Sequence, residues 1–312
     1  MSAAADVKKS MEYERCGKMI AEYPYVEICP GIYEINEFDN VSMFLIVGEE
    51  KALLIDTGIG IGDIRSFAEK LAQKPVEVFL THNHRDHVSN SPLFSEVYMS
   101  RIDYGMGKLI RPLTCKESRK QYIETTVKKH MDRHYPWCDV DIREFSESEE
   151  PKVHLIEDGY QFDLGGRGVT CYLCPGHTPG SMVAVDSTTK YVFSGDCCNK
   201  ILGIGVRPIP GMEHKSIEES YDAMRRIWDI GIDVKNIYSA HADFRKVGEP
   251  LEDYIFETIM DGLKKIVEGN YVAGKKWIHM IDTEVDIAIF KDIVIQFHAE
   301  NVYRRKKGTT YE

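Results

Sequence analysis

The sequence has no long hydrophobic run and few cysteines. None of its 312 residues lies in an apolar stretch near the roughly 18 residues that a membrane-spanning helix needs, so no membrane partner is expected. The first 20 residues lack the apolar core of a signal peptide. The eight cysteines are scattered, which excludes a disulfide-stapled scaffold. These absences predict free thiols and a cytoplasmic location.

Basic residues are also in the minority. Lys and Arg number 39 against 50 Asp and Glu, which gives a net charge of −11. Because proteins that follow a nucleic-acid backbone need clustered basic side chains, no nucleic-acid partner is expected. The short basic run at residues 304–307 is interpreted as a solvated tail. With 43% hydrophobic and 29% charged residues, the composition is that of a globular protein and excludes a collagen-like, disordered or coiled-coil chain.

Short β-rich runs alternate with amphipathic helical segments, which predicts a layered α/β fold. Helices are expected at 63–73, with Asp63 as N-cap, and at 216–230 and 252–268. Two similar β-rich halves suggest a duplicated unit, although no sequence repeat supports it. Strands are expected at 26–28, 32–35, 42–47, 52–55 and 76–80, and again at 153–157, 169–173, 182–185, 191–193 and 236–239.

Two segments stand apart from this pattern. Residues 101–150 are rich in charged and aromatic side chains, and a helix is expected at 117–133. We interpret 101–150 as a helical insertion, and as a candidate substrate lid, within a single domain spanning 1–312. Residues 270–312 are interpreted as a C-terminal extension whose strands, 285–290 and 293–297, extend a sheet or form a homodimer contact.

The densest chemistry directly follows the strand expected at 76–80. Three histidines and an aspartate occur there within six residues: His82, His84, Asp86 and His87. On an extended backbone, His82 and His84 point to the same side, and a turn after His84 can direct the other two to a second position. Imidazole and carboxylate are the usual ligands of hydrolytic Zn²⁺. A polar loop of structural histidines is the competing interpretation, and this density makes it improbable.

Three more candidate ligands follow later strands, where loops commonly present chemistry on a rigid scaffold. His177 lies in a turn-rich loop after 169–173, Asp196 follows 191–193, and His241 follows 236–239. Together with the cluster they make seven nitrogen and oxygen ligands. Seven ligands suffice for two four-coordinate metal ions that share a bridging carboxylate and a water molecule.

This ordered set, preceded by Asp56-Thr57-Gly58, resembles the metallo-β-lactamase superfamily over roughly residues 26–245. The resemblance implies an αββα four-layer sandwich with the metal ions at one edge. It also implies a role for each candidate residue. His82, His84 and His177 would bind the first ion, Asp86, His87 and His241 the second, Asp196 would bridge them, and Asp56 would support the ligands from behind.

The expected cofactors are two divalent metal ions, with Zn²⁺ favoured and Mn²⁺ or Fe²⁺ also compatible with such ligands. Di-iron oxygen- or nitric-oxide-reducing relatives carry Glu at the position of His84 and usually append a flavodoxin-like domain, so that branch is disfavoured. The tRNA-processing nuclease branch adds a substrate-gripping arm, and no such arm is recognisable here.

The ligand set predicts a hydrolase. Two metal ions about 3.5–4 Å apart can hold a hydroxide that attacks a carbonyl or phosphoryl centre. Asp86 is the expected catalytic residue, since it can orient the nucleophile and carry its proton. We expect hydrolysis of a thioester, ester, lactone or amide-like bond. A phosphodiesterase or nuclease is the alternative, followed by a redox or sensing metalloprotein of the same fold.

The substrate is expected to be a small molecule. The insertion offers five candidate pocket residues, and packing within the insertion is the competing interpretation. Cys197, next to Asp196, is interpreted as a small buried side chain. The five pocket candidates are Tyr104, His130, His134, Tyr135 and Trp137.

Overall fold

The first half of the chain forms a seven-stranded sheet in a computed structural model, which describes residues 23–37, 41–105, 121, 125, 150–206, 215–279 and 281–304. Its strands lie in chain order; the first four are antiparallel neighbours and the last four are parallel. They are β1 (Tyr25–Cys29), β2 (Ile32–Glu37), β3 (Val41–Val47), β4 (Ala52–Ile55), β5 (Val76–Leu80), β6 (Glu96–Ser100) and β7 (Lys152–Ile156).

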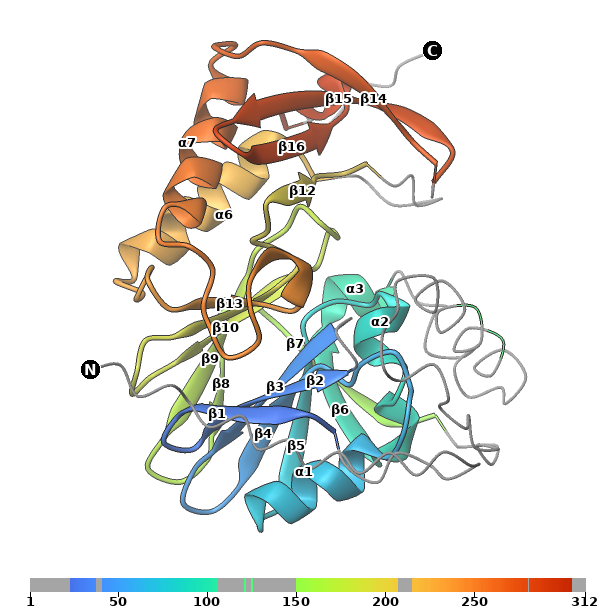
Figure 1. Ribbon diagram of the computed structural model, residues 1–312, viewed down its shortest axis with the longest axis vertical. Coiled ribbons are helices and arrows are strands. Elements are labelled where there is room, and N and C mark those ends of the chain that lie inside the picture. The colour runs from blue at the N-terminus through green and yellow to red at the C-terminus, as the bar shows by residue number, and fades with distance from the viewer. Residues whose placement is uncertain are drawn as a thin grey trace.

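A second sheet of five strands packs against the first (Figure 1). Its order is β13-β11-β10-β9-β8, and β11 and β13 run parallel. The strands are β8 (Tyr160–Asp163), β9 (Gly168–Leu173), β10 (Met182–Asp186), β11 (Val192–Gly195) and β13 (Ile237–Ser239).

Aromatic side chains fill the space between the two sheets. The rings of Phe44 and Phe193, one from each sheet, have centroids 4.9 Å apart. Phe79 and Phe162 make a second contact across the same interface, at 6.1 Å. Because alternate residues of each strand face this layer, the two sheets share one apolar core.

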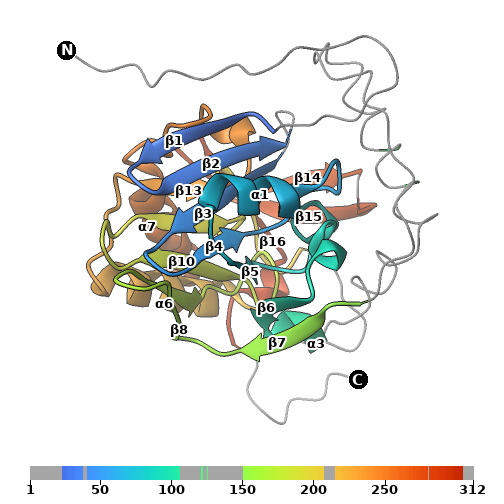
Figure 2. The same cartoon turned by 90° about the horizontal axis from the view of Figure 1, so that it is seen from below.

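Helices cover the outer faces of both sheets. Helix α1 (Ile64–Ala72) lies on the first sheet, as Figure 2 shows from below. Its buried side chains include Ile64 and Phe67. Helices α6 (Ile217–Asp229) and α7 (Ile255–Val267) cover the second sheet. The layers are therefore helix, sheet, sheet and helix, as expected. The short helices α2 (Arg85–Val88) and α3 (Arg101–Gly105) and the 3₁₀ turns η1 (Ser91–Leu93), η2 (Ala242–Phe244) and η3 (Ala299–Asn301) complete the elements described.

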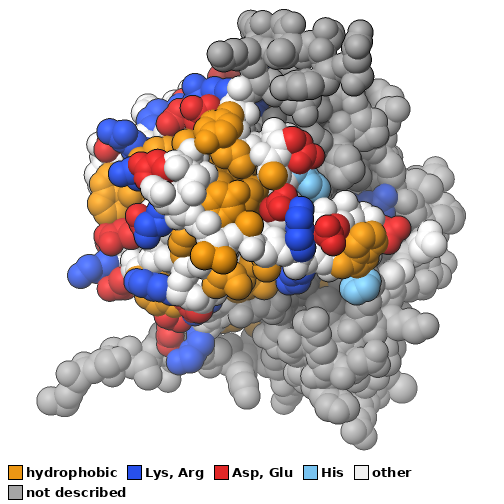
Figure 3. All heavy atoms as spheres, turned by 90° about the horizontal axis from the view of Figure 1, so that it is seen from above, with side chains coloured by type: hydrophobic (Ala, Val, Ile, Leu, Met, Phe, Trp, Pro, Cys, Tyr) orange, Lys and Arg blue, Asp and Glu red, His pale blue; other side chains and the backbone are white. Residues whose placement is uncertain are grey.

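The end of the chain builds a third sheet against α7. Its order is β12-β16-β15-β14, so β12, which closely follows Asp196 in the chain, pairs with the last strand. Figure 3 looks onto this part of the molecule and shows hydrophobic side chains gathered between charged ones. Two hydrophobic residues of this sheet, Ile201 and Ile289, are 46% and 60% exposed. The strands are β12 (Ile201–Gly203), β14 (Gly274–Ile278), β15 (Thr283–Phe290) and β16 (Ile293–Phe297).

Each expected strand, and each expected helix within the described residues, is present with bounds shifted by a few residues. Asp63 caps α1 by accepting a hydrogen bond from Ser66 N. The sequence patterns missed β6, β8, β12 and β14. The helix expected at 117–133 lies, apart from residues 121 and 125, outside the described residues. No helix among those described is long and apolar enough to cross a membrane.

A buried ion pair joins β2 of the first sheet to the loop that follows β13 of the second. Arg245 donates to Glu34 through Nη1 at 2.9 Å and Nη2 at 2.8 Å, and both side chains are almost fully buried. Glu34 also accepts hydrogen bonds from Ser42 Oγ and Gly248 N. The guanidinium lies 5.5 Å from the centroid of the Phe44 ring. Every charge in this pair is therefore compensated within the fold.

Replacing Glu34 by Gln should destabilise the fold strongly, because it leaves the Arg245 charge buried without its carboxylate. We expect the free energy of unfolding in urea to fall by about 3–5 kcal/mol. Glu69→Ala is the matched control, since Glu69 pairs with Arg65 on the surface and should cost about 0.5 kcal/mol or less. Equal losses in the two variants would contradict this account.

Candidate metal centre

Loops at one edge of the two sheets converge on a single site. Each of them leaves the carboxyl end of a strand: Thr81 and His82 follow β5, Asp196 follows β11, and His241 closely follows β13. Parallel strands bring their carboxyl ends to the same edge, so residues far apart in the chain meet there. Two backbone hydrogen bonds join the sheets at this edge: Met182 N donates to Thr81 O at 2.9 Å, and Ser42 N donates to Ala240 O.

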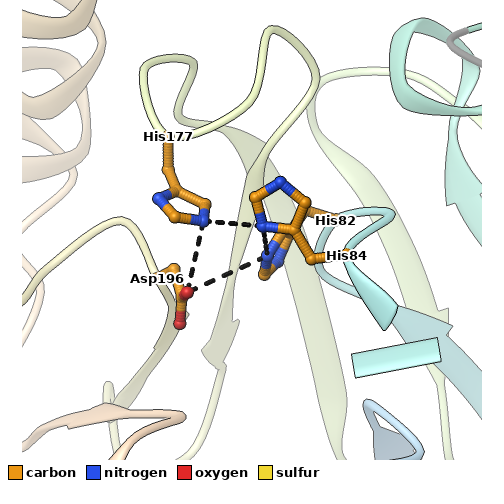
Figure 4. Close-up of side chains that lie close together, drawn as sticks. All are labelled: His82, His84, His177 and Asp196. Carbon is orange, nitrogen blue, oxygen red and sulfur yellow. Dashed lines mark hydrogen bonds and ion pairs between the residues drawn. The ribbon is translucent and has the colours of Figure 1, made fainter. Parts of the chain in front are cut away.

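The first group of side chains combines His82, His84, His177 and Asp196, whose facing atoms all lie within 4.8 Å of one another (Figure 4). His84 Nδ1 is 3.1 Å from His82 Nε2 and 2.9 Å from His177 Nε2. His177 Nε2 is 3.2 Å from Asp196 Oδ2, and His82 Nε2 is 3.9 Å from the same oxygen. Three imidazole nitrogens and one carboxylate oxygen thus face a common point.

The second group combines Asp86, His87 and His241. Asp86 Oδ2 lies 3.6 Å from His87 Nε2 and 3.7 Å from His241 Nε2. Asp196 contributes here through its other oxygen, since Oδ1 is 3.2 Å from His241 Nε2 and 3.6 Å from His87 Nε2. The carboxylate of Asp196 therefore lies between the two groups.

These separations fit metal coordination. Ligand atoms 2.0–2.1 Å from a tetrahedral Zn²⁺ are about 3.3 Å apart, close to the spacings in both groups. Two buried atoms, His87 Nε2 and Asp196 Oδ1, make no hydrogen bond within the described part of the chain. Buried polar atoms are nearly always paired, so these two indicate a missing partner. A divalent cation between the groups would supply one.

Asp56 fixes the orientation of two of the imidazoles. Its Oδ2 accepts hydrogen bonds from His87 Nδ1 at 2.9 Å and from Thr81 Oγ1 at 2.8 Å. Because the Thr81 hydroxyl donates to Asp56, it accepts from His82 Nδ1 at 3.0 Å. His82 and His87 therefore carry their ring hydrogen on Nδ1, and each presents the Nε2 lone pair to the site.

The electrostatics of the two groups differ. Burial and the neighbouring imidazoles of His87 and His84 hold the pKa of His82 well below its usual value, which keeps His82 in the neutral form that can coordinate a cation. Burial alone would lower the pKa of His87, but Asp86, Asp196 and Asp56 outweigh it and raise that pKa well above its usual value.

In His241 and Asp196, too, neighbouring charges outweigh the effect of burial on the pKa. Burial opposes the shift at His241, yet Asp196 and Asp86 raise its pKa to about 9. Burial would raise the pKa of Asp196, but the imidazoles of His241, His87 and His177 hold it well below its usual range. The second group therefore favours positive charge, and a divalent cation can provide that charge in place of protons.

Other predicted residues fall beside or beyond this site. Tyr104 lies on α3 and is 37% exposed. Cys197 is buried, and its thiol contacts Cys174 O at 3.3 Å, in agreement with its interpretation as a small packing residue. The remaining pocket candidates, His130, His134, Tyr135 and Trp137, lie outside the described residues.

Two residues that hold the site together carried no recognisable signal in the sequence. Arg245 donates to Ser239 O through Nη2 at 2.7 Å and so anchors the loop that carries His241. Asp103 accepts hydrogen bonds from both sides of the first group. Neither residue belongs to a motif, and their contacts are long-range.

Several solved structures share the fold. A beta-lactamase domain protein from Burkholderia ambifaria aligns over 81% of this chain and 75% of its own, with a TM-score of 0.53 and 18% identity. A metallo-beta-lactamase family protein from Thermus thermophilus aligns over 80% of this chain and 86% of its own, with a TM-score of 0.51 and 18% identity.

Sequence relatives agree with the fold. This chain is 28% identical over 202 residues to the metallo-beta-lactamase fold-containing protein ST1585 of Sulfurisphaera tokodaii, a match covering 62% of this chain and 72% of that one. It is 25% identical over 194 residues to human acyl-coenzyme A thioesterase MBLAC2, covering 56% and 66% of the two chains. It is 24% identical over 202 residues to the probable polyketide biosynthesis zinc-dependent hydrolase PksB of Bacillus subtilis, covering 65% and 72%. The matches thus span about two thirds of these relatives' length.

The family profile covers most of the two-sheet core. It matches residues 36–234, which include Asp56, the cluster from His82 to His87, His177 and Asp196. His241 lies shortly beyond the matched range, and the structure brings it to the same site. The ordered motif, the layered fold and the profile agree, and the chain belongs to the metallo-beta-lactamase superfamily.

Proposed function

We propose that this protein is a metal-dependent hydrolase that cleaves a small carbonyl substrate, with a thioester as the first candidate. One observation carries the proposal: seven side chains form two groups that share the carboxylate of Asp196. We propose His82, His84, His177 and Asp196 as ligands of one divalent ion, and Asp86, His87, His241 and Asp196 as ligands of the other. Zn²⁺ is the favoured ion, since its preferred ligands and geometry match the site.

Two divalent ions bound in these groups would supply a Lewis acid and a water molecule of lowered pKa. The chain's own residues provide orientation and proton transfer. With 29% of its side chain accessible, Asp86 can reach a water or substrate at the mouth of the site. We assign Asp86 to orienting the nucleophilic water and carrying its proton.

The relatives support the choice of substrate class. One has the name of an acyl-coenzyme A thioesterase and another that of a probable zinc-dependent hydrolase of polyketide biosynthesis. Acyl-coenzyme A is a thioester, and its carbonyl carbon is open to attack by an activated water. We therefore rank thioesters first, followed by esters, lactones and amide-like bonds, and we retain Tyr104 as a candidate substrate contact.

Metal content should fall when a proposed ligand is removed. We expect His84→Ala and His177→Ala each to lose about one of two Zn²⁺ ions per chain and at least ten-fold in activity, because both side chains face the same point in the first group. The number of Zn²⁺ ions per chain is measured by inductively coupled plasma mass spectrometry, after loosely bound metal has been removed from the protein.

His154→Ala is the matched control for this experiment. His154 stacks on Tyr98 and pairs with Glu96, away from both groups. It should keep both ions and full activity. Full Zn²⁺ occupancy in both His84→Ala and His177→Ala would overturn the ligand assignment.

The reaction class is tested by comparing carbonyl and phosphoryl substrates on Zn²⁺-loaded protein. We expect metal-dependent turnover of acyl-coenzyme A thioesters, with weaker activity on esters and lactones, and loss of turnover when a chelator removes the metal. A chromogenic β-lactam, a bis-aryl phosphodiester and a short RNA complete the panel.

The outcome of this comparison separates the candidate functions. Turnover confined to the phosphodiester or the RNA would overturn the proposal while leaving the fold and the site intact. Turnover of lactones but not thioesters would keep the carbonyl hydrolase and remove the thioester assignment.

A further inference from the structure

Asp103 accepts hydrogen bonds from Asn83, Thr178 and Gly180, which lie beside His82, His84 and His177 in the chain. It belongs to the short helix α3, which follows β6, and its side chain is fully buried. We propose that Asp103 is a positioning residue that fixes the distance between the loop of His82 and His84 and the loop of His177, and thereby sets the affinity of the first metal position. This inference rests on the proposed function only in taking the first group as a metal site.

On one side, Asp103 holds the residue between two ligands. Its Oδ2 accepts a hydrogen bond from Asn83 N at 3.0 Å, and its backbone oxygen accepts from Asn83 Nδ2 at 3.0 Å. Asn83 stands between His82 and His84, so these two bonds fix the backbone on which both imidazoles are mounted.

On the other side, the same carboxylate holds the loop of His177. Oδ2 accepts a hydrogen bond from Thr178 Oγ1 at 2.7 Å, and Oδ1 accepts from Gly180 N at 2.7 Å. Thr178 immediately follows His177. One carboxylate therefore links the segment after β5 of the first sheet to the β9–β10 loop of the second.

The approach of the two loops is close enough to need a glycine. A Cβ at position 180 would lie 2.5 Å from both Asp103 N and Asp103 Oδ1, inside contact distance. Gly180 therefore lets the loop approach the carboxylate. In the first group, His84 Nδ1 lies 3.1 Å from His82 Nε2 and 2.9 Å from His177 Nε2. A shift of one loop relative to the other would increase the distance between His84 and His177.

The charge of Asp103 suits this role. Burial raises its pKa to about 6, against the opposing effect of its hydrogen bonds from Thr178, Gly180 and Asn83. At pH 7.5 the group remains ionised, and an ionised carboxylate accepts stronger hydrogen bonds than a neutral acid or amide.

The test measures metal affinity rather than turnover. Zn²⁺ is titrated into metal-free protein at pH 7.5 in competition with a chromophoric chelator, and the binding step that disappears in His177→Ala is assigned to the first group. We expect Asp103→Asn to weaken that step 10–100-fold, because residues that orient ligands have effects of this size. The other step should change less than three-fold.

Asp186→Asn is the matched control. Asp186 is also fully buried and accepts hydrogen bonds from Arg167 and Thr189. It is the last residue of β10, whereas Met182, the first residue of the same strand, adjoins the site. It should lower the melting temperature as much as Asp103→Asn and leave both metal steps unchanged. Unchanged steps in Asp103→Asn, or an equal loss in Asp186→Asn, would overturn the proposal.

Thr178→Val probes the same contact from the other loop and serves if Asp103→Asn does not fold. It removes the hydroxyl that donates to Asp103 and keeps the side-chain volume. We expect Zn²⁺ binding at the first group to weaken by about 3–10-fold, because Thr178 would help Asp103 to orient the ligands. Unchanged Zn²⁺ binding at this group would count against the proposal. Because only metal binding is measured, failure of hydrolysis in the wild-type protein would refute the proposed function without deciding the role of Asp103.

Discussion

The hydrogen bond from His87 to Asp56 is the interaction on which the site depends. The rings of His82 and His87 have centroids only 4.0 Å apart and are both buried, an arrangement that costs free energy unless each nitrogen has a defined partner. Asp56 accepts a hydrogen bond from His87 directly. It also accepts one from the Thr81 hydroxyl, which in turn accepts a hydrogen bond from His82. The opposite nitrogen of His82 then faces Asp196, and that of His87 faces both Asp86 and Asp196. The carboxylate that orients the imidazoles is thus distinct from those of Asp86 and Asp196, which we propose as metal ligands.

The backbone of Asp56 is adapted to this position. Its φ of 63° lies in the left-handed region, which aspartate tolerates better than most residues. Asp56 directly follows β4, and its neighbour Thr57 donates through N and Oγ1 to the backbone oxygen of His87. The Asp-Thr-Gly motif therefore holds His87 by both side chain and main chain.

The same principle recurs at the other loops of the site. Asp103 holds the segments of the first group together, and Glu34 holds Arg245, which anchors the loop of His241. Each is a buried carboxylate that collects hydrogen bonds from segments distant in the chain. Since burying a carboxylate without partners is costly, these links also make the convergence of the two sheets specific.

The parts of this structure that could be predicted from the sequence are those with local patterns. Strand β5 and the histidines after it are a contiguous signal, and period-two geometry already separates His82 and His84 from Asp86 and His87. The αββα layering followed from alternating strands and helices together with the family resemblance.

The missed parts depend on tertiary context. Strand β12 has only three residues and owes its pairing to β16, nearly a hundred positions later. Asp103 gives no local signal, because its partners are 20 to 77 positions away. Glu34 lies in the largely buried strand β2, and its burial is explained by hydrogen bonds from Arg245, 211 positions later, and from Ser42 and Gly248. The sequence therefore predicted which side chains cluster at the site, while the contacts that support them required the fold.

The central claim is that two metal ions share the carboxylate of Asp196. The most direct measurement is anomalous X-ray diffraction from crystals of the Zn²⁺-loaded protein, with data on both sides of the zinc absorption edge. The account predicts two zinc peaks, one within reach of His82, His84 and His177 and the other within reach of Asp86, His87 and His241, each within bonding distance of Asp196. A single peak, or two peaks of which only one lies beside Asp196, would contradict it.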